Sequence, residues 1–269
     1  MEKSLTPYRL SILASDKCLH YMTFSPIVDN SLKSCRIDYP TDMTSAQSAL
    51  ENTVYDTPTL LEQYSRVDTL VDTRRYVTVE ADNDHDATMR AETLLATLYP
   101  ETHSYEVITH QIGRRAWIAM AVDKATTAFL RRTFDQPTIN HRLTPLALYL
   151  GHRSRFGNGG RIHVSLHDNS LDIIAYEASS LLMINTFDAT SANDAIYFIL
   201  ATADMLDFDI SSDRLFITGE SPYRADLIEL LDQHLVHPMP MIYPSEMLRA
   251  GGLSLNVPIE IITLPLCAL

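Results

Sequence analysis

Apolar and polar residues alternate in two segments of the chain, Arg9–Phe24 (RLSILASDKCLHYMTF) and Arg161–Tyr176 (RIHVSLHDNSLDIIAY). Each predicts an apolar strand, a polar turn centred on Asp16 or Asp168, and a second strand, because strand side chains point to alternate faces. The second segment begins 152 residues after the first, just past the middle of the chain. We therefore predict two duplicated halves, although two unrelated hairpins would show the same alternation.

The remainder of the first half predicts further strands and helices. Strands are expected at Ser34–Tyr39, Val67–Val71, Tyr76–Glu80, Tyr105–Gln111 and Ala116–Val122. Helices are expected at Thr44–Asn52, near Pro58–Gln63, at Ala87–Leu98 and at Lys124–Phe134. The acidic loop Asp82–Asp86 can cap the helix that follows it, and Pro100 ends that helix.

The second half has a clearer pattern. Strands are expected at Ile162–Leu166, Leu171–Tyr176, Leu181–Thr186, Arg214–Thr218 and Pro258–Thr263, and helices at Ala192–Leu206 and Tyr223–Leu235. Thr190 or Ser191 can cap the first of these helices, and Pro222 stands at the favoured start of the second.

Glycine marks the expected boundary between the halves. Four of the eight glycines fall within 151–160 (GHRSRFGNGG), a composition that breaks regular structure. We predict a first lobe at 1–150, a Gly/Arg-rich connection at 151–160 and a second lobe at 161–269. Because the connection also carries His152, Arg153 and Arg155, a phosphate-cradling loop is the alternative to a plain linker.

Composition limits the class of protein. The chain has 269 residues, of which 46% are hydrophobic and 20% charged, as in ordinary globular proteins. It contains no apolar run of ~18 residues, so no membrane insertion is expected. The start, MEKSLTPYRL, lacks the apolar core of a signal peptide, which favours a cytoplasmic location. Cys18, Cys35 and Cys267 are odd in number and widely spaced, which argues against a disulfide framework or a metal knuckle.

Charge argues against one further class of partner. The formal net charge is −13, which opposes general nucleic-acid binding. Arginine makes up 17 of the 21 cationic residues, with pairs at Arg74–Arg75, Arg114–Arg115 and Arg131–Arg132. Such pairs are usually solvated or salt-bridged, and the alternative is a surface that recognises anions or a partner.

The order of elements resembles a known fold. Three strands, a helix, a strand and a helix follow one another from Ile162 through Leu235, and the first half shows the same order with inserted strands around Val67–Glu80. This layout, with the RLSI start and the INH segment (Ile139–His141), resembles the actin-like ATPase (ribonuclease H-like) fold. It is most similar to an uncharacterised bacterial family of unknown function with that fold. The resemblance implies an α/β protein with mixed sheets, in which two lobes flank a nucleotide cleft.

The resemblance also implies where nucleotide would bind. Actin-like ATPases carry an Asp-x-Gly turn in each opening hairpin, where glycine lets backbone amides approach phosphate and the carboxylate holds hydrated magnesium. Here both turns keep a carboxylate, Asp16 or Asp168, but neither has the glycine. The adenosine motif keeps one glycine, Gly219, followed by Glu220. We therefore interpret Asp16, Asp168 and Gly219 as vestigial nucleotide positions, and assign neither a catalytic residue nor a metal ligand.

A group of polar residues on one strand is a further candidate site. His163, Ser165 and His167 share one strand face, and with Asp168 they could form part of a metal site. Two imidazoles are only part of a ligand set, so histidines satisfied by the fold are the favoured interpretation.

The sequence favours a non-catalytic scaffold or interaction module, a pseudo-ATPase with a protein partner and no cofactor. The alternative is a divergent Mg-ATP-binding protein or ATPase, and a third hypothesis is a nucleic-acid-processing enzyme that uses two metals. Partner identity and oligomeric state are left open by the sequence.

Overall fold

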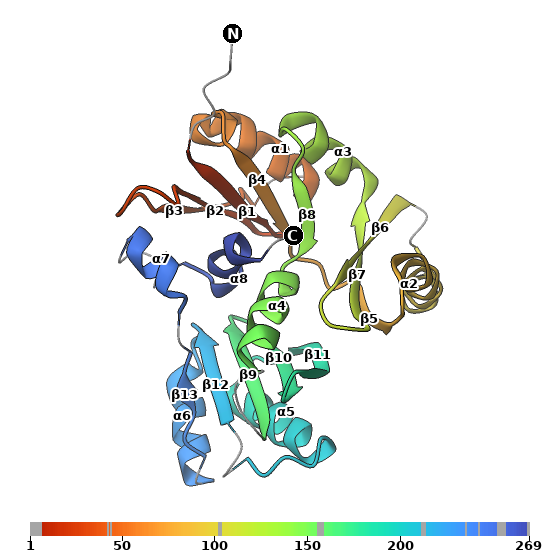
Figure 1. Cartoon of the computed structure of the whole chain (residues 1–269), viewed down its shortest axis with the longest axis vertical. Helices are drawn as coiled ribbons and strands as arrows, with labels where there is room; N and C mark the ends of the chain where they lie inside the picture. Colours follow the sequence, from red (N-terminus) through yellow and green to blue (C-terminus); the bar gives the residue numbers. More distant parts are fainter. Residues whose placement is uncertain are drawn as a thin grey trace. The chain divides into compact units, whose positions relative to one another are not determined.

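The chain divides into two compact units in the computed structural model, which describes residues 7–41, 43, 45–101, 104–154, 159–210, 214–234, 236–241, 243–251 and 257–267. The first unit comprises residues 1–146 and 243–269, and the second comprises 147–242. The expected boundaries of the lobes, 1–150 and 161–269, stay a prediction. Each unit is built around its own sheet (Figure 1).

The elements follow one another in this order. Those of the first unit are β1 Arg9–Ala14, β2 Cys18–Phe24, β3 Lys33–Asp38, α1 Ala46–Asp56, the 3-10 turn η1 Pro58–Leu61, β4 Arg66–Val71, β5 Tyr76–Glu80, α2 Asp84–Leu98, β6 Tyr105–Gln111, β7 Ala116–Asp123, α3 Lys124–Thr133 and β8 Thr138–His141. Helix α4, Leu143–Ser154, leads into β9 Gly160–His167, β10 Ser170–Glu177, β11 Ser180–Asp188, α5 Ala192–Met205, β12 Arg214–Gly219, α6 Arg224–Gln233 and β13 Met239–Pro240. The first unit ends with α7 Ser245–Ala250, α8 Ile259–Thr263 and the 3-10 turn η4 Leu264–Leu266.

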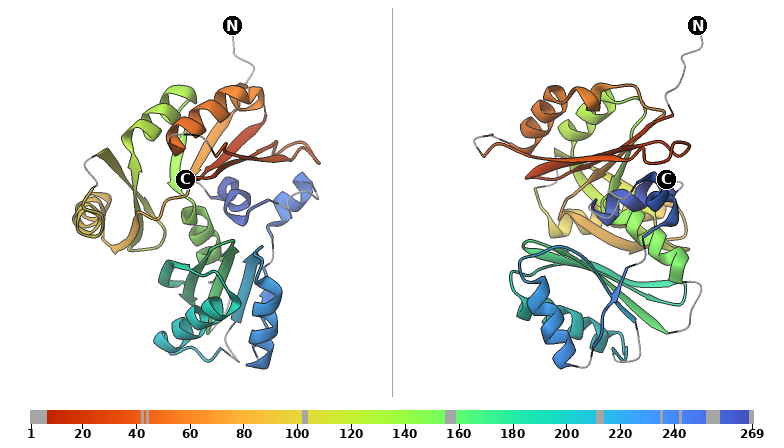
Figure 2. Two further views of the ribbon diagram at one scale, coloured as in Figure 1. Left: turned by 180° about the vertical axis from the view of Figure 1, so that it is seen from behind. Right: turned by 90° about the vertical axis from the view of Figure 1, so that its left-hand side faces the viewer.

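The main sheet of the first unit has the strand order β3-β2-β1-β4-β8. Strands β1, β2 and β3 are antiparallel neighbours, whereas β4 runs parallel to β1 and β8 runs parallel to β4. Helices α1 and α3 cover one face of this sheet (Figure 2). Their buried residues pack on the apolar residues of β1, a set that comprises Leu50, Val54, Phe129, Leu130, Leu10, Ile12 and Ala14.

A second, three-stranded sheet of order β5-β7-β6 lies within the same unit. Strand β7 is shared between two cores: Met120 and Val122 belong to the core of the main sheet, and Ala119 and Ala121 pack with α2. The expectation that inserted strands cover Val67–Glu80 is therefore corrected, because β4 is a central strand of the main sheet and only β5 belongs to the smaller one.

The sheet of the second unit repeats the topology of the first. Its order is β11-β10-β9-β12-β13, with β9, β10 and β11 antiparallel and with β12 parallel to β9. Helices α5 and α6 bury one face over Ile162, Val164 and Leu166. Helix α5 begins at a capping box in which Ser191 and Asp194 satisfy each other's backbone amides, as the sequence predicts. The α/β class with mixed sheets and an internal duplication of topology are thus confirmed.

Two segments differ from the prediction. Pro258–Thr263 was predicted as a strand, but Ile259–Thr263 forms helix α8 with all five residues buried; burial of every side chain overrode the β propensity of this Ile-rich segment. In the predicted connection, α4 continues through Gly151 to Ser154, and residues 155–158 lie outside the described part of the chain. A Cβ at Gly151 would lie 3.2 Å from the ring of Tyr176, so glycine here allows close helix–sheet packing.

Two expectations from composition can be compared with the structure. Cys18, Cys35 and Cys267 are free thiols. Within the described ranges, no helix combines the length and the apolar character needed to cross a membrane.

Candidate functional site: the two opening hairpins

The β1–β2 turn of the first unit is closed by the side chain of Ser15. The Ser15 Oγ accepts from the backbone N–H of Cys18 at 2.9 Å and from that of Lys17 at 3.2 Å. The Ser15 backbone N–H and hydroxyl both lie within hydrogen-bond distance of the Cys18 carbonyl oxygen, at 3.0 and 2.9 Å. Asp16 is exposed at the tip of the turn. The amides of Lys17 and Cys18 are therefore already bonded within the turn.

We expect Ser15→Ala to lower the free energy of unfolding by about 1–2 kcal/mol, because it leaves two turn amides without their acceptor. Urea denaturation followed by circular dichroism measures this difference. Asp16→Ala in the same turn is the matched control, and it should change the stability by less than about 0.5 kcal/mol. Equal effects of the two substitutions would contradict the role assigned to Ser15.

Tyr223 supports the β9–β10 turn of the second unit through hydrogen bonds. Asp168 and Asn169 are exposed at its tip. The hydroxyl of the buried Tyr223 lies 3.3 Å from the carbonyl oxygens of both His167 and Ser170. This turn is thus fixed through its carbonyl groups, and its shape is set by tertiary contacts.

Gly219 ends β12 beside the same hairpin. Its φ is +78°, and a Cβ at this position would lie 2.2 Å from the carbonyl oxygen of Leu166, its register partner on β9. The glycine is therefore required by the approach of two backbones. The structure brings Gly219 next to Leu166, two residues before Asp168, whereas Asp16 belongs to the first unit.

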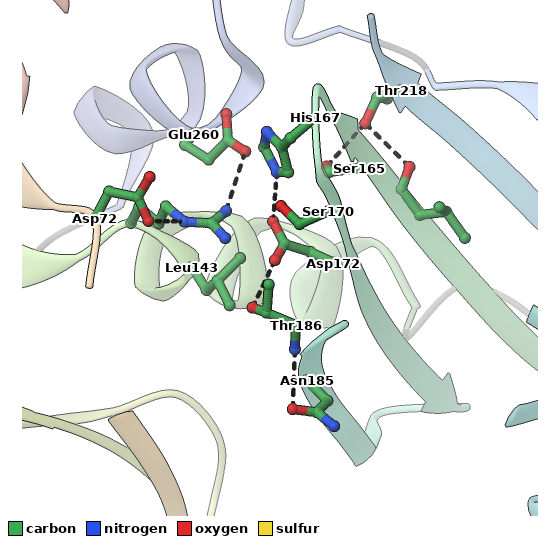
Figure 3. Close-up of polar contacts among 12 residues, drawn as sticks. Asp72, Leu143, Ser165, His167, Ser170, Asp172, Asn185, Thr186, Thr218 and Glu260 are labelled. Atoms are coloured by element: carbon green, nitrogen blue, oxygen red, sulfur yellow. Dashed lines mark hydrogen bonds and ion pairs between the residues drawn. The ribbon is translucent and has the colours of Figure 1, made fainter. Parts of the chain in front are cut away.

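His163, Ser165 and His167, on one face of β9, each contact a different partner. His167 Nε2 lies 2.7 Å from Asp172 Oδ2, and the other carboxylate oxygen of Asp172 accepts from Thr186 at 2.7 Å (Figure 3). The Ser165 hydroxyl lies 3.0 Å from that of Thr218. The predicted sharing of one face is confirmed, but these side chains pair across the sheet rather than converge on Asp168.

His163 on this face stacks on Phe216, with ring centroids 4.7 Å apart. Both ring nitrogens are buried without a hydrogen-bond partner in the described part of the chain. Burial, and secondarily the positive charges of Arg161 and Arg153, lower the pKa of His163 to about 3. His163 is therefore neutral in the folded protein near neutral pH.

This lowered pKa predicts an acid-sensitive fold. Below pH ~6.5, His163 of the unfolded chain becomes protonated, whereas His163 of the folded chain stays neutral until about pH 3. The free energy of unfolding therefore falls as the pH drops through this range. We expect His163→Phe to reduce the loss of stability between pH 7 and pH 4 by about 2–3 kcal/mol. Denaturation at the two pH values measures it. His85→Phe, at an exposed site on α2, should leave the loss unchanged; an unchanged loss in His163→Phe would contradict the assignment.

Sequence reasoning missed Asp172 and Ser15. Asp172 lies diagonal to His167 across the β9–β10 pair, since His167 is opposite Ser170 and Asp172 is opposite Ser165. Diagonal neighbours of this kind are within reach of long side chains, so the register of the hairpin could have predicted the His167–Asp172 pair. For Ser15, the signal was a serine placed before a two-residue turn.

Comparison with known proteins places these hairpins in a family. The profile of the family "Protein of unknown function (DUF3822)" matches residues 2–237. The chain belongs to this family. No curated protein matches the DUF3822 chain.

Solved structures show which fold the DUF3822 chain adopts. A Bacteroides thetaiotaomicron protein with an actin-like ATPase fold and unknown function superposes with a TM-score of 0.80 at 23% identity, over 97% of this chain and 96% of that one. A structure of the PilM–PilN type IV pilus biogenesis complex gives a TM-score of 0.57 at 14% identity, over 96% and 98%. The actin-like ATPase fold is therefore shown.

Proposed function

We propose that this chain is a pseudo-ATPase, a non-hydrolysing interaction module on the actin-like fold that binds a protein partner. The observation that carries the proposal is the closed β1–β2 turn. The Ser15 hydroxyl holds the amides of Lys17 and Cys18, which an Asp-x-Gly turn would leave available to phosphate oxygens. A nucleotide would have to displace this hydroxyl and also pass the side chains at the tip.

The second unit supports the same proposal. Gly219 is packed against the backbone of Leu166, so its lack of a side chain serves the contact between strands. Asp168 alone remains as a carboxylate at the tip of the β9–β10 turn. One exposed carboxylate supplies little of the oxygen set that holds magnesium with a nucleotide.

A surface of the first unit supports binding of a partner. Ile27 is 79% exposed and Leu248 is 45% exposed, and both adjoin residues that line a pocket of about 200 Å³. The loop that carries Ile27 is tied to helix α7 and its end by backbone bonds, Asn30 N–H to Arg249 at 3.3 Å and Leu32 N–H to Ala250 at 2.9 Å. Val28 and Leu266, which line this pocket, are exposed as well, and adjoining exposed apolar residues mark interaction sites. The similar PilM–PilN structure, a type IV pilus biogenesis complex, is a precedent for assembly by this fold.

Nucleotide binding is tested by thermal unfolding with magnesium alone and with magnesium plus ATP, ADP or GTP. A ligand at ~100 times its dissociation constant stabilises the native state by ~2.7 kcal/mol, which corresponds to several degrees in Tm. We expect no shift beyond that of magnesium alone. A nucleotide-specific shift that Asp16→Ala or Asp168→Ala removes would establish the Mg-ATP-binding alternative.

The partner is tested separately by site-specific photocrosslinking in the source cells. A photoreactive phenylalanine analogue replaces Ile27, and in a control it replaces Leu98 on α2, which is 59% exposed. We expect a discrete protein adduct from position 27 and none from position 98. If neither position gives an adduct, or both give the same ones, the assigned surface is wrong.

A further inference from the structure

Three arginines gather at the beginning of the central strands of the second unit. Arg161 on β9 and Arg214 on β12 are register partners in the parallel pair. Ile162 and Leu215, the next residues on the two strands, belong to the core beneath α5 and α6. Because side chains alternate along a strand, Arg161 and Arg214 lie on the opposite face of the sheet. The carbonyl oxygen of Arg153, in the last turn of α4, accepts from the guanidinium of Arg161 at 3.0 Å. We call Arg153, Arg161 and Arg214 the arginine cluster.

The cluster has no ion-pair partner in the part of the chain that the structure describes. Arg161 is only 9% exposed, and its pKa is lowered by burial and then by the charges of Arg214 and Arg153. Like charges directly opposite one another on a sheet are destabilising. In a chain with a net charge of −13, such a concentration of positive charge needs a reason.

The first unit shows how the same arrangement is neutralised without a ligand. Arg9 and Arg66 are also register partners at the start of two parallel strands. There, two residues further along β4, the buried Asp68 binds Arg66 with a Nε–Oδ1 distance of 2.8 Å. The corresponding residue on β12 is Phe216, which stacks on His163. The second unit thus keeps the two arginines but has no carboxylate at this position.

The role of Arg161 as a cap for α4 accounts for only part of the cluster. Its bond to the Arg153 carbonyl satisfies the end of that helix. It uses one of the five donors of the guanidinium, and it does not explain Arg214. The Arg153 guanidinium donates one bond to the Tyr149 hydroxyl at 3.2 Å and lies over that ring, which leaves its other donors for a ligand. Arg153 and Arg214 are both exposed, so their side chains are accessible to a dissolved anion.

We propose that the arginine cluster binds a small, doubly charged oxyanion, either inorganic phosphate or the phosphate group of a phosphate monoester. The planar fork of each guanidinium matches two oxygens of such an anion, and charge-assisted bonds of this kind are the strongest hydrogen bonds in proteins. The cluster lies at the opposite end of β9 from Asp168, about 23 Å away along the strand. It is therefore separate from the vestigial nucleotide positions of the second unit, and the inference does not depend on the proposed function.

Titration calorimetry of the full chain tests this site with inorganic phosphate, phosphoserine and, at matched ionic strength, chloride. We expect saturable binding of both phosphate compounds, with the tighter one showing whether the free anion or a monoester is preferred. Arg153→Gln and Arg214→Gln should each weaken binding about tenfold, since each removes a charge-assisted contact. Arg115→Gln removes an exposed arginine of the first unit and should leave the affinity unchanged. Retained thermal unfolding transitions show that the variants fold.

A second readout separates binding from simple charge repulsion. Millimolar phosphate should raise the Tm of the wild-type chain by several degrees relative to chloride and should raise the Tm of Arg214→Gln by a clearly smaller amount. The inference is overturned if phosphate and chloride act alike on the wild type. It is equally overturned if phosphate binds Arg214→Gln and Arg153→Gln as tightly as it binds the wild type.

Discussion

Gly219→Ala is expected to destabilise the protein by more than about 4 kcal/mol, because two costs combine at this position. An alanine would be held at φ +78°, a region that costs about 1–3 kcal/mol for residues with a Cβ. Its Cβ would also lie 2.2 Å from the Leu166 carbonyl oxygen and 2.9 Å from the Leu166 nitrogen, so that β9 and β12 would have to separate. Urea denaturation, or loss of soluble protein, measures the effect.

Gly251→Ala is the matched control for this substitution. Gly251 also has a positive φ, +147°, but among the described residues the nearest atom to an added Cβ is the Cβ of Leu32 at 3.7 Å. It should therefore show the cost of backbone strain alone, about 1–3 kcal/mol. If Gly219→Ala were no worse than Gly251→Ala, the approach of the two strands could not be the reason for the glycine.

Asp68→Asn should cost about 3 kcal/mol of stability. Asp68 is 1% exposed and accepts from Arg66 Nε at 2.8 Å and from the Thr138 hydroxyl at 2.7 Å. The substitution keeps the shape of the side chain but removes the charge that offsets Arg66 and its neighbour Arg9. Breaking a buried pair by removing the charge of one partner typically costs about 3–5 kcal/mol. We expect the lower figure here because the Arg66 side chain is 34% exposed.

Asp38→Asn tests the same geometry at the surface. Arg36 and Asp38 on β3 have the same spacing along a strand, and their Nε–Oδ1 distance is 2.9 Å, but their side chains are 58% and 71% exposed. Solvent screens such a pair, so the expected loss is below about 0.5 kcal/mol. Similar losses for Asp68→Asn and Asp38→Asn would mean that burial does not determine the value of the Asp68 pair.

Local patterns in the sequence predicted most of the fold. The hairpins around Asp16 and Asp168 were readable because alternation of period two is a local property. Helix α4 was not predicted, since Gly151 was taken as a helix breaker, and only the ring of Tyr176, 25 residues later, shows why a glycine lies within the helix. Pro258–Thr263 was assigned wrongly for a related reason: it is too short for a period to show, and packing determined its conformation.

The candidate site was predicted less completely. Local sequence correctly showed that both turns lack the glycine of an Asp-x-Gly motif. It did not show that Ser15 takes over the turn amides, nor that Gly219 faces the backbone of Leu166. The arginine cluster was also hidden, because Arg161 and Arg214 become neighbours only through the parallel pairing of β9 and β12. Contacts between residues distant in sequence set the chemistry at each of these places.

The first unit is discontinuous in sequence, which bears on how the chain folds during synthesis. Residues 147–242 form the second unit, and 243–269 return to the first, where the Leu32 amide bonds to the Ala250 carbonyl. As the chain leaves the ribosome, the second unit has all of its strands before α7 and α8 exist. Because domains tend to fold as they emerge, the second unit can mature first, while the first keeps an apolar surface open to chaperones until translation has passed α8.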